Sequence, residues 1–195
     1  MGASADAFRP AGTATPIDPV NRFLRLPAVF SAARGGFERS VTFGEALWHG
    51  VFDSAYTRPG DYLVQQAGTW FVVAQPPLMP VLCARANRTV SFLRPAAPSV
   101  TGASGYGGVT LATATPLLTD WPASVLGASG GSAPVAGLPS DTSVPYWTIL
   151  LPASAAGVFL RTGDLMTDDL GRTATIAAAE LTDLGWRIAA RQATT

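Results

Sequence analysis

The feature that most constrains the fold of this chain is an internal repeat. Residues 58–74 align without a gap with residues 161–177, and the hydrophobic positions follow the alignment. The identical positions are Arg58 and Arg161, Gly60 and Gly163, Asp61 and Asp164, Gly68 and Gly171, and Ala74 and Ala177. Self-similarity of this kind predicts one small structural unit that is built twice.

The first copy has the pattern of a β-hairpin. Gly60 permits a sharp turn, and Asp61 is placed to accept backbone hydrogen bonds where the next strand begins. The β-prone runs 61–64 and 69–74 are separated by Gln65-Gln66-Ala67-Gly68, with Gly68 at the left-handed turn position. We therefore expect two antiparallel strands joined by a tight turn.

The second copy repeats this arrangement with more acidic turn residues. Gly163 and Asp164 again precede a strand, and Asp168-Asp169-Leu170-Gly171 predicts a type I turn closed by a glycine bulge between strands 165–167 and 173–177. Clustered carboxylates also suit Ca²⁺. The spacing of Asp164, Asp168 and Asp169 is not that of an EF-hand loop, and the first copy has glutamines at the last two positions, so we favour the turn.

Other segments complete a mainly β fold class. Strands are predicted at 81–83, 89–93 and 146–151, with a closing strand near 184–188. Phe43 to Phe52 fits either a helical turn or a strand. Asp18-Pro19 predicts a short helix that ends before Pro27. We expect one or two small antiparallel β-barrel or sandwich units.

The expected domain organisation has four parts. Residues 1–17 are small and proline-punctuated and predict an extended N-terminal arm. Residues 18–95 are expected to form a first β unit and residues 146–195 a second, either separate from the first or packed with it as one domain. Residues 96–145 are rich in Gly, Pro and Ser and predict a long insertion or arm that packs on a neighbour.

The composition indicates a surface that is covered by partners. Charged residues make up 13% of the chain, hydrophobic residues 48%, and 13 acidic residues balance 13 basic ones. A free monomer normally carries more interspersed charge; the alternative is a Thr/Ser/Gly surface kept soluble by hydrogen bonds. All basic residues are arginine, which excludes chemistry that needs a lysine amine, such as Schiff-base catalysis or the Walker loop.

No set of residues in the sequence supports catalysis, a cofactor or a metal. His49 is the single histidine, and we expect it to pack rather than act as a base. Gly127-Ala-Ser129-Gly-Gly131 matches a nucleophile elbow only formally, because neither a strand nor a helix is predicted beside it. A hydrolase would need His49, Ser129 and Asp53 or Asp61, and we expect no enzyme. The lone Cys83 is expected to be a buried, inert thiol.

Arginine is dispersed along the chain apart from Arg85, Arg88 and Arg94, which are candidates to face DNA or a protein partner. Residues 1–18 have neither the basic start nor the apolar core of a signal peptide, and no stretch approaches a membrane span. We therefore expect the chain to fold in a bacterial cytoplasm.

The motifs carry a resemblance to phage proteins. Arg58-Pro-Gly-Asp61 through Arg85, and Arg161-Thr-Gly-Asp164 through Arg187, resemble structural proteins in prophage gene cassettes of GC-rich proteobacteria. The second motif is also similar to the β-barrel of phage head-closure, or stopper, proteins. Together these motifs cover about a third of the chain.

The resemblance implies a virion protein that forms a homo-oligomeric ring in the neck. Such a ring joins the portal to the tail, retains packaged DNA and touches it without sequence specificity, with extended arms and edge strands linking subunits. A tail or capsid-decorating protein is the related alternative. A surface module that binds a receptor or glycan through Tyr106 and Trp121 is a further alternative.

Overall fold

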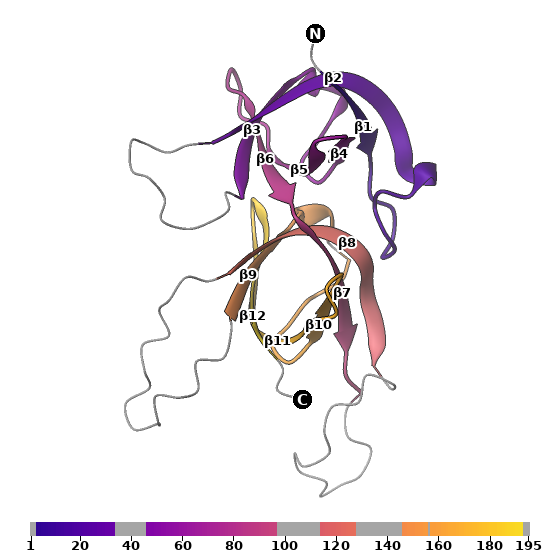
Figure 1. Cartoon of the computed structure of the whole chain (residues 1–195), viewed down its shortest axis with the longest axis vertical. Helices are drawn as coiled ribbons and strands as arrows, with labels where there is room; N and C mark the ends of the chain where they lie inside the picture. Colours follow the sequence, from indigo (N-terminus) through magenta and orange to yellow (C-terminus); the bar gives the residue numbers. More distant parts are fainter. Residues whose placement is uncertain (1–2, 34–45, 97–113, 128–145, 156, 193–195) are drawn as a thin grey trace, which may run out of the picture.

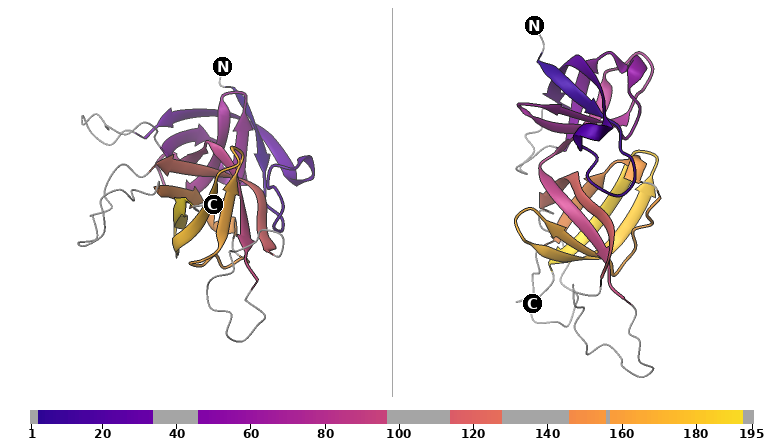
Figure 2. Two further views of the ribbon diagram at one scale, coloured as in Figure 1. Left: turned by 60° about the horizontal axis from the view of Figure 1, so that its bottom comes forward. Right: turned by 90° about the vertical axis from the view of Figure 1, so that its right-hand side faces the viewer.

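The computed structural model describes residues 3–33, 46–96, 114–127, 146–155 and 157–192, and these residues form two closed antiparallel β-barrels. Strands make up 62% of the structure and helix 6%. The barrels are stacked along the long axis of the molecule, with the N-terminal barrel above the C-terminal barrel in Figure 1 and in the side view of Figure 2. The mainly β class and the barrel architecture are therefore confirmed.

The N-terminal barrel has the circular strand order β1-β2-β3-β6-β5-β4. Its strands are β1 (Ser4–Phe8), β2 (Arg22–Ala32), β3 (Leu47–Phe52), β4 (Tyr62–Gln65), β5 (Gly68–Ala74) and β6 (Val81–Ala86). One-turn 3₁₀ helices, η1 (Pro19–Asn21) and η2 (Ser54–Tyr56), precede β2 and β4. Its interior is filled by apolar side chains that include Leu63, Trp70 and Cys83.

The C-terminal barrel has the order β10-β11-β12-β9-β8-β7. Its strands are β7 (Arg88–Arg94), β8 (Thr115–Gly127), β9 (Tyr146–Leu151), β10 (Leu165–Asp168), β11 (Thr173–Thr182) and β12 (Gly185–Gln192), with the 3₁₀ turn η4 (Ala153–Ala155) after β9. Phe92, Trp121, Ile149, Ile176 and Ile188 lie in its core.

The two barrels are copies of one topology. Substituting β7 for β1, β8 for β2 and so on to β12 for β6 converts one strand order into the other. A β-bulge interrupts the pairing of β5 with β6 at Val72/Ala74 and that of β11 with β12 at Ile176/Ala178. The predicted hairpin repeat is therefore part of a repeat of the whole six-stranded barrel.

The predicted gap-free alignment of the two hairpins is wrong by one residue after the turn. Gln66 and Ala67 turn the first hairpin, because Gln65 pairs with Gly68. The second turn is one residue longer, since the Asp168 amide bonds to the Arg172 carbonyl across residues 169–171. Gly171, with φ 74°, occupies the left-handed bulge position, whereas Gly68 begins a strand.

Two predictions about the N-terminal region are wrong. Residues 1–17 are not an extended arm, because Ser4–Phe8 forms β1 and pairs with both β2 and β4. The short helix is a single 3₁₀ turn: the Asp18 carboxylate accepts the Val20 amide, but the chain enters β2 at Arg22. Pro27 lies within this strand, opposite Ser4.

The predicted domain limits also change. The boundary between the β units lies at Asn87 rather than at residue 95, because β6 ends at Ala86 and β7 begins at Arg88. Residues 96–145 are not one insertion, since β8 lies within them and crosses the C-terminal barrel between β7 and β9. Residues 97–113 and 128–145 lie outside the described part of the chain. Of the segment from Phe43 to Phe52, for which a helical turn and a strand were both predicted, Leu47–Phe52 forms strand β3.

The barrels share a continuous apolar core. Tyr62, Phe71 and Val73 on the outer face of the N-terminal barrel belong to the same buried cluster as the interior of the C-terminal barrel. The Tyr62 hydroxyl donates to the Pro122 carbonyl at 2.8 Å, and the Tyr62 ring meets the Trp121 ring edge to face. The N-terminal barrel thus covers the end of the C-terminal barrel at which β8 arches over the core (Figure 1).

The connection between the barrels is also fixed by hydrogen bonds. The Asn87 side chain donates to the Val125 carbonyl at 2.9 Å and accepts the Val125 amide at 2.8 Å. The Trp121 indole N–H donates to the Thr13 carbonyl at 2.9 Å.

No helix among the described residues is long and apolar enough to cross a membrane.

Candidate functional site

The repeated Arg-x-Gly-Asp segment builds the same ion pair in each barrel. In the N-terminal barrel the segment turns between η2 and β4, and Asp61 is completely buried at the turn. Its carboxylate accepts the Arg58 amide at 3.0 Å and both the Nε and Nη2 groups of Arg9, at 2.9 and 2.8 Å. Because Arg9 follows the end of β1, this bidentate bond joins the start of the chain to the hairpin.

The C-terminal barrel contains the matching set. Asp164 is 1% exposed and accepts the Arg161 amide at 2.9 Å, while Arg94 at the end of β7 donates from Nε and Nη2 at 2.9 and 2.8 Å. Backbone bonds match as well, since the Gly60 amide donates to Val72 and the Gly163 amide to Ile176. We call each set a staple: Arg9 with Asp61, and Arg94 with Asp164.

In each staple the ion pair stabilises the charged form of the arginine. The hydrogen bond that Arg9 donates to Asp61 raises the pKa of Arg9 above its ordinary value, against the opposing effect of desolvation, and the bond that Arg94 donates to Asp164 raises the pKa of Arg94 in the same way. Each carboxylate also has a second arginine, Arg58 or Arg161, with its Nε 4.0 Å away. Each carboxylate thereby ties the turn before the hairpin to the end of a neighbouring strand.

Each staple also presents an exposed aromatic side chain. Arg9 donates to the Tyr56 carbonyl at 3.3 Å, and Arg94 donates to the Phe159 carbonyl at 2.6 Å. The Tyr56 and Phe159 side chains are 63% and 78% exposed. The repeat therefore preserves an ion pair with a buried carboxylate, together with an outward aromatic residue beside it.

The acidic turn of the second hairpin is satisfied internally. The Asp168 carboxylate accepts the Leu170 and Arg172 amides and the Arg172 Nε group, at 3.1, 2.9 and 2.7 Å. Burial alone would raise the pKa of Asp168, but the hydrogen bonds and charge of Arg172 and the Leu170 amide outweigh it, so that this pKa is lowered. Asp169 lies 3.9 Å from Arg88.

The Ca²⁺ alternative for this turn gains no support from the geometry. Asp164 and Asp168 are engaged by different arginines, Arg94 and Arg172. Within the described ranges no three His, Cys, Asp or Glu side chains gather as a metal site would require.

The three candidate partner-facing arginines each have an intramolecular contact. Arg85 lies with its guanidinium 5.4 Å from the centre of the Trp48 ring, and Arg88 contacts Asp169 and the Asn87 carbonyl. Arg94 is held in its staple. That these residues face DNA or a protein remains a prediction.

The residues considered for hydrolysis or glycan binding, and the lone cysteine, lie in separate settings. His49 lies on β3 opposite Ser31 and Leu82, with a buried Nδ1 atom, while Asp61 is held by Arg9. Ser129 and Tyr106 lie outside the described residues. Trp121 is fully buried with its indole N–H bonded, so it is not available to a glycan. Burial raises the pKa of Cys83 to about 12.

Arg9 is the residue that sequence reasoning missed. Its signal is a second repeat: Phe8-Arg9-Pro10-Ala11 corresponds to Leu93-Arg94-Pro95-Ala96. A third repeat matches Leu26-Pro27-Ala28 in β2 to Trp121-Pro122-Ala123 in β8. The pairing of β1 with β4 and of β7 with β10 gives these short matches their meaning.

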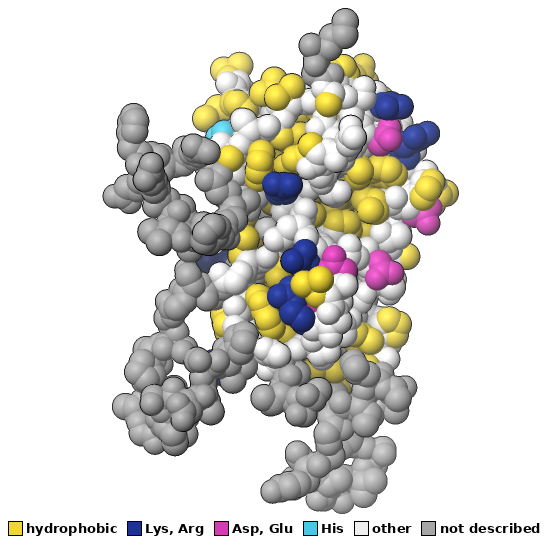
Figure 3. Space-filling view, in the orientation of Figure 1, with side chains coloured by type: hydrophobic (Ala, Val, Ile, Leu, Met, Phe, Trp, Pro, Cys, Tyr) yellow, Lys and Arg dark blue, Asp and Glu magenta, His cyan; other side chains and the backbone are white. Residues whose placement is uncertain are grey.

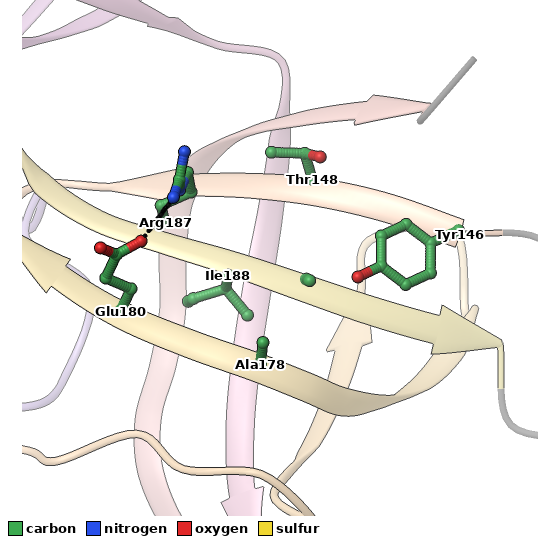
Figure 4. Close-up of a pocket in the computed structure, with 7 residues that line it drawn as sticks. Tyr146, Thr148, Ala178, Glu180, Arg187 and Ile188 are labelled. Atoms are coloured by element: carbon green, nitrogen blue, oxygen red, sulfur yellow. Dashed lines mark hydrogen bonds and ion pairs between the residues drawn. The ribbon is translucent and has the colours of Figure 1, made fainter. Parts of the chain in front are cut away.

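The described surface is sparsely charged and carries exposed apolar side chains. Figure 3 shows hydrophobic side chains over much of one face, with few charged groups among them. Among the largest exposures are those of Leu78, Val20, Phe159, Met79, Val51 and Val29. A shallow groove of about 320 Å³ lies on the outer face of β9, β12 and β11 (Figure 4). It is lined by Tyr146, Thr148, Ala178, Glu180, Arg187, Ile188 and Ala189.

Comparison with protein-family models, curated proteins and solved structures found no match to the chain.

Proposed function

We propose that this protein is a structural subunit of a phage particle, specifically a stopper-like ring subunit in the neck that joins the capsid portal to the tail and helps to retain DNA. Its partners are further copies of the chain, the portal or adaptor protein and the tail, with non-specific contact to packaged DNA. It is made in the host cytoplasm and resides in the virion.

The observation that carries the proposal is a duplicated frame with a sparsely charged, apolar surface. Two staples with buried carboxylates and a shared core hold the barrels, while Val29, Val51 and Phe159 remain exposed. Apolar side chains on a surface with little charge favour association with other protein surfaces. This supports an assembled subunit over a free enzyme or transport protein.

The mode of association differs from strand addition. Both described sheets close into barrels, and closure removes the free edges to which a further strand would add. Subunits would therefore contact one another through side chains on the outer faces.

Immunogold electron microscopy tests the proposed location. Antibody against the purified chain should label particles from an induced lysogen that carries the gene, at the junction of head and tail. Label along the tail or over the capsid would favour the tail or capsid-decorating alternative. Particles that carry no label, beside clear labelling of a known capsid protein, would refute a role in the virion.

A receptor-binding or glycan-binding module is the second candidate. The exposed Tyr56 and Phe159, each near an exposed arginine, are the observation that favours it, because aromatic faces bind sugar rings. Binding to a glycan array that is lost in the Tyr56→Ala/Phe159→Ala variant would support this candidate.

A further inference from the structure

The interface between the two barrels shows what one barrel of this type can bind. The outward positions Pro122 and Ser124 of β8 are buried, and Tyr62 of the N-terminal barrel bonds to the Pro122 carbonyl. The neighbouring position on β9, Leu150, is partly buried against the shared core. The outer side of β8 and β9 at this end of the C-terminal barrel is thus a docking surface, which we call the seat. The outer face of β4, β5 and β6 packs on it.

The N-terminal barrel has the same seat, and it is exposed. In register with their strands, Pro27 and Val29 of β2 correspond to Pro122 and Ser124 of β8, and Val51 of β3 corresponds to Leu150 of β9. Val29 and Val51 lie directly opposite each other and are 53% and 63% exposed. We call Pro27, Val29 and Val51 the head patch.

The head patch is more apolar than its buried counterpart. Val29 stands where the C-terminal barrel has Ser124, which is 1% exposed. Ser31 and His49 pair beside Val29 and Val51, and the next outward position of β2, Arg25, has its Nε 3.7 Å from Asp6 Oδ1. An apolar patch bordered by a paired arginine fits a protein surface better than a nucleic acid or an anionic lipid.

The matching tail is the outer face of β10, β11 and β12. There Leu165 corresponds to Tyr62, Thr175 to Phe71, and Ala178 to Ala74 beside the bulge that both barrels share. The groove on β9, β12 and β11 borders this face at Ala178 and Ala189 and also contains the Glu180–Arg187 ion pair (Figure 4). We call this face, around Thr175, Ala178 and Ala189, the tail face.

We propose that a second copy of this chain seats its tail face on the head patch, repeating between molecules the step that relates the two barrels within one. This inference rests on the proposed role as a subunit of a homo-oligomer. Contacts of this head-to-tail kind are heterologous and close into rings or extend as filaments. Smaller side chains on the tail face than on its N-terminal counterpart make the contact weaker than the intramolecular one.

Sedimentation equilibrium of the full chain with two blocked variants tests the proposal. Wild-type protein should exceed the 20.2 kDa monomer mass, and both Val29→Asp/Val51→Asp, blocked at the head, and Ala178→Arg, blocked at the tail, should remain monomeric. Leu78→Asp, at a still more exposed apolar site in the β5–β6 connection, should associate like wild type. Circular dichroism melting establishes that each variant is folded.

Mixing the two blocked variants gives the decisive outcome. A head-to-tail contact predicts a one-to-one dimer that cannot extend, because one variant supplies an intact tail and the other an intact head. If the mixture stays monomeric, or if Ala178→Arg dimerises alone through two head patches, the proposal is overturned. A wild-type chain that is monomeric overturns it too.

The result separates this inference from the proposed function. Association that survives both blocking variants refutes the head-to-tail contact and leaves a virion role standing. Particle labelling without self-association would support the virion role and refute the head-to-tail contact. Self-association without particle labelling would support the contact and refute the virion role.

Discussion

At the residue scale, the molecule depends on two carboxylates that the repeat places identically. Asp61 and Asp164 are buried, and each is satisfied by a bidentate arginine and a backbone amide. Removing one partner of a buried pair leaves the other uncompensated, which costs far more than the loss of an exposed pair.

Removing the arginine should therefore destabilise the protein strongly, because the buried Asp61 carboxylate then loses its bidentate partner. We expect Arg9→Ala to lower the free energy of unfolding by about 3 kcal/mol, measured by urea denaturation. The exposed pair of Glu180 with Arg187 provides the matched control, since Arg187→Ala should cost less than about 1 kcal/mol. Equal costs for the two substitutions would contradict the staple's role.

Because the pKa of Asp168 is lowered in the folded protein, the stability of the fold should decrease at low pH. A carboxyl group whose pKa is lower in the folded than in the unfolded state stabilises the fold above its ordinary pKa of 3.8. That contribution is lost as the pH falls below this value towards the folded-state pKa. Asp168→Asn should be less stable than wild type at pH 7, and the difference should shrink towards pH 2 when urea midpoints are measured along the series.

Cys83 should be unreactive in the native protein. It is fully buried, and its pKa of about 12 leaves almost no thiolate at pH 8. A disulfide reagent such as dithionitrobenzoate should label the thiol only in denaturant. Rapid labelling of the folded chain would show that the N-terminal barrel opens locally.

At the scale of elements, closure of each barrel requires particular turns. The chain passes from β11 to β12 through residues 183–184, and β12 begins at Gly185 with φ 123°. A Cβ atom at this position would overlap the Leu151 carbonyl oxygen of β9. Only glycine fits there, because both the backbone conformation and the space exclude a side chain.

Gly185→Ala should accordingly cost more than an alanine at another left-handed glycine. We expect a loss of about 3 kcal/mol, the sum of backbone strain and steric overlap. Gly163→Ala, at φ 91° with open space around the site, isolates the strain and should cost about 1 kcal/mol. Thermal melts of both variants give the comparison; similar melting temperatures would show that the strand start moves to make room.

At the scale of the whole molecule, we expect the two barrels to unfold as one cooperative unit, because their apolar cores merge. Tyr62 is the centre of the junction, since its ring lies between Phe71 and Trp121 and its hydroxyl reaches Pro122. Calorimetry of the wild-type chain should show a single unfolding transition.

Truncation of that tyrosine should uncouple the barrels. Tyr62→Ala removes a large buried side chain, with an expected cost of about 4 kcal/mol, and should split the calorimetric transition into two. Tyr62→Phe keeps the packing and should cost about 1 kcal/mol with one transition retained. Tyr56→Ala, at an exposed site, should change neither the transition nor its midpoint.

The amino-acid sequence by itself determined the local features: the β class, the two hairpins, the bulged turn at Gly171, and the segments of β6, β7 and β9. These depend on residues close along the chain, where turn chemistry and alternation act. It also determined that Asp61 and Asp164 are equivalent.

Only the tertiary structure decided that β1 is a strand, that a segment with two prolines forms strand β8, and that Arg9 is the partner of Asp61. An alanine-rich run such as Ser4–Phe8 has little strand signal of its own, and it becomes β1 because β2 and β4 supply hydrogen bonds on both sides. Barrel closure brings Arg9 and Asp61 together from distant positions, and burial of the carboxylate then makes their pairing necessary. Contacts of that range follow from burial and not from any local pattern.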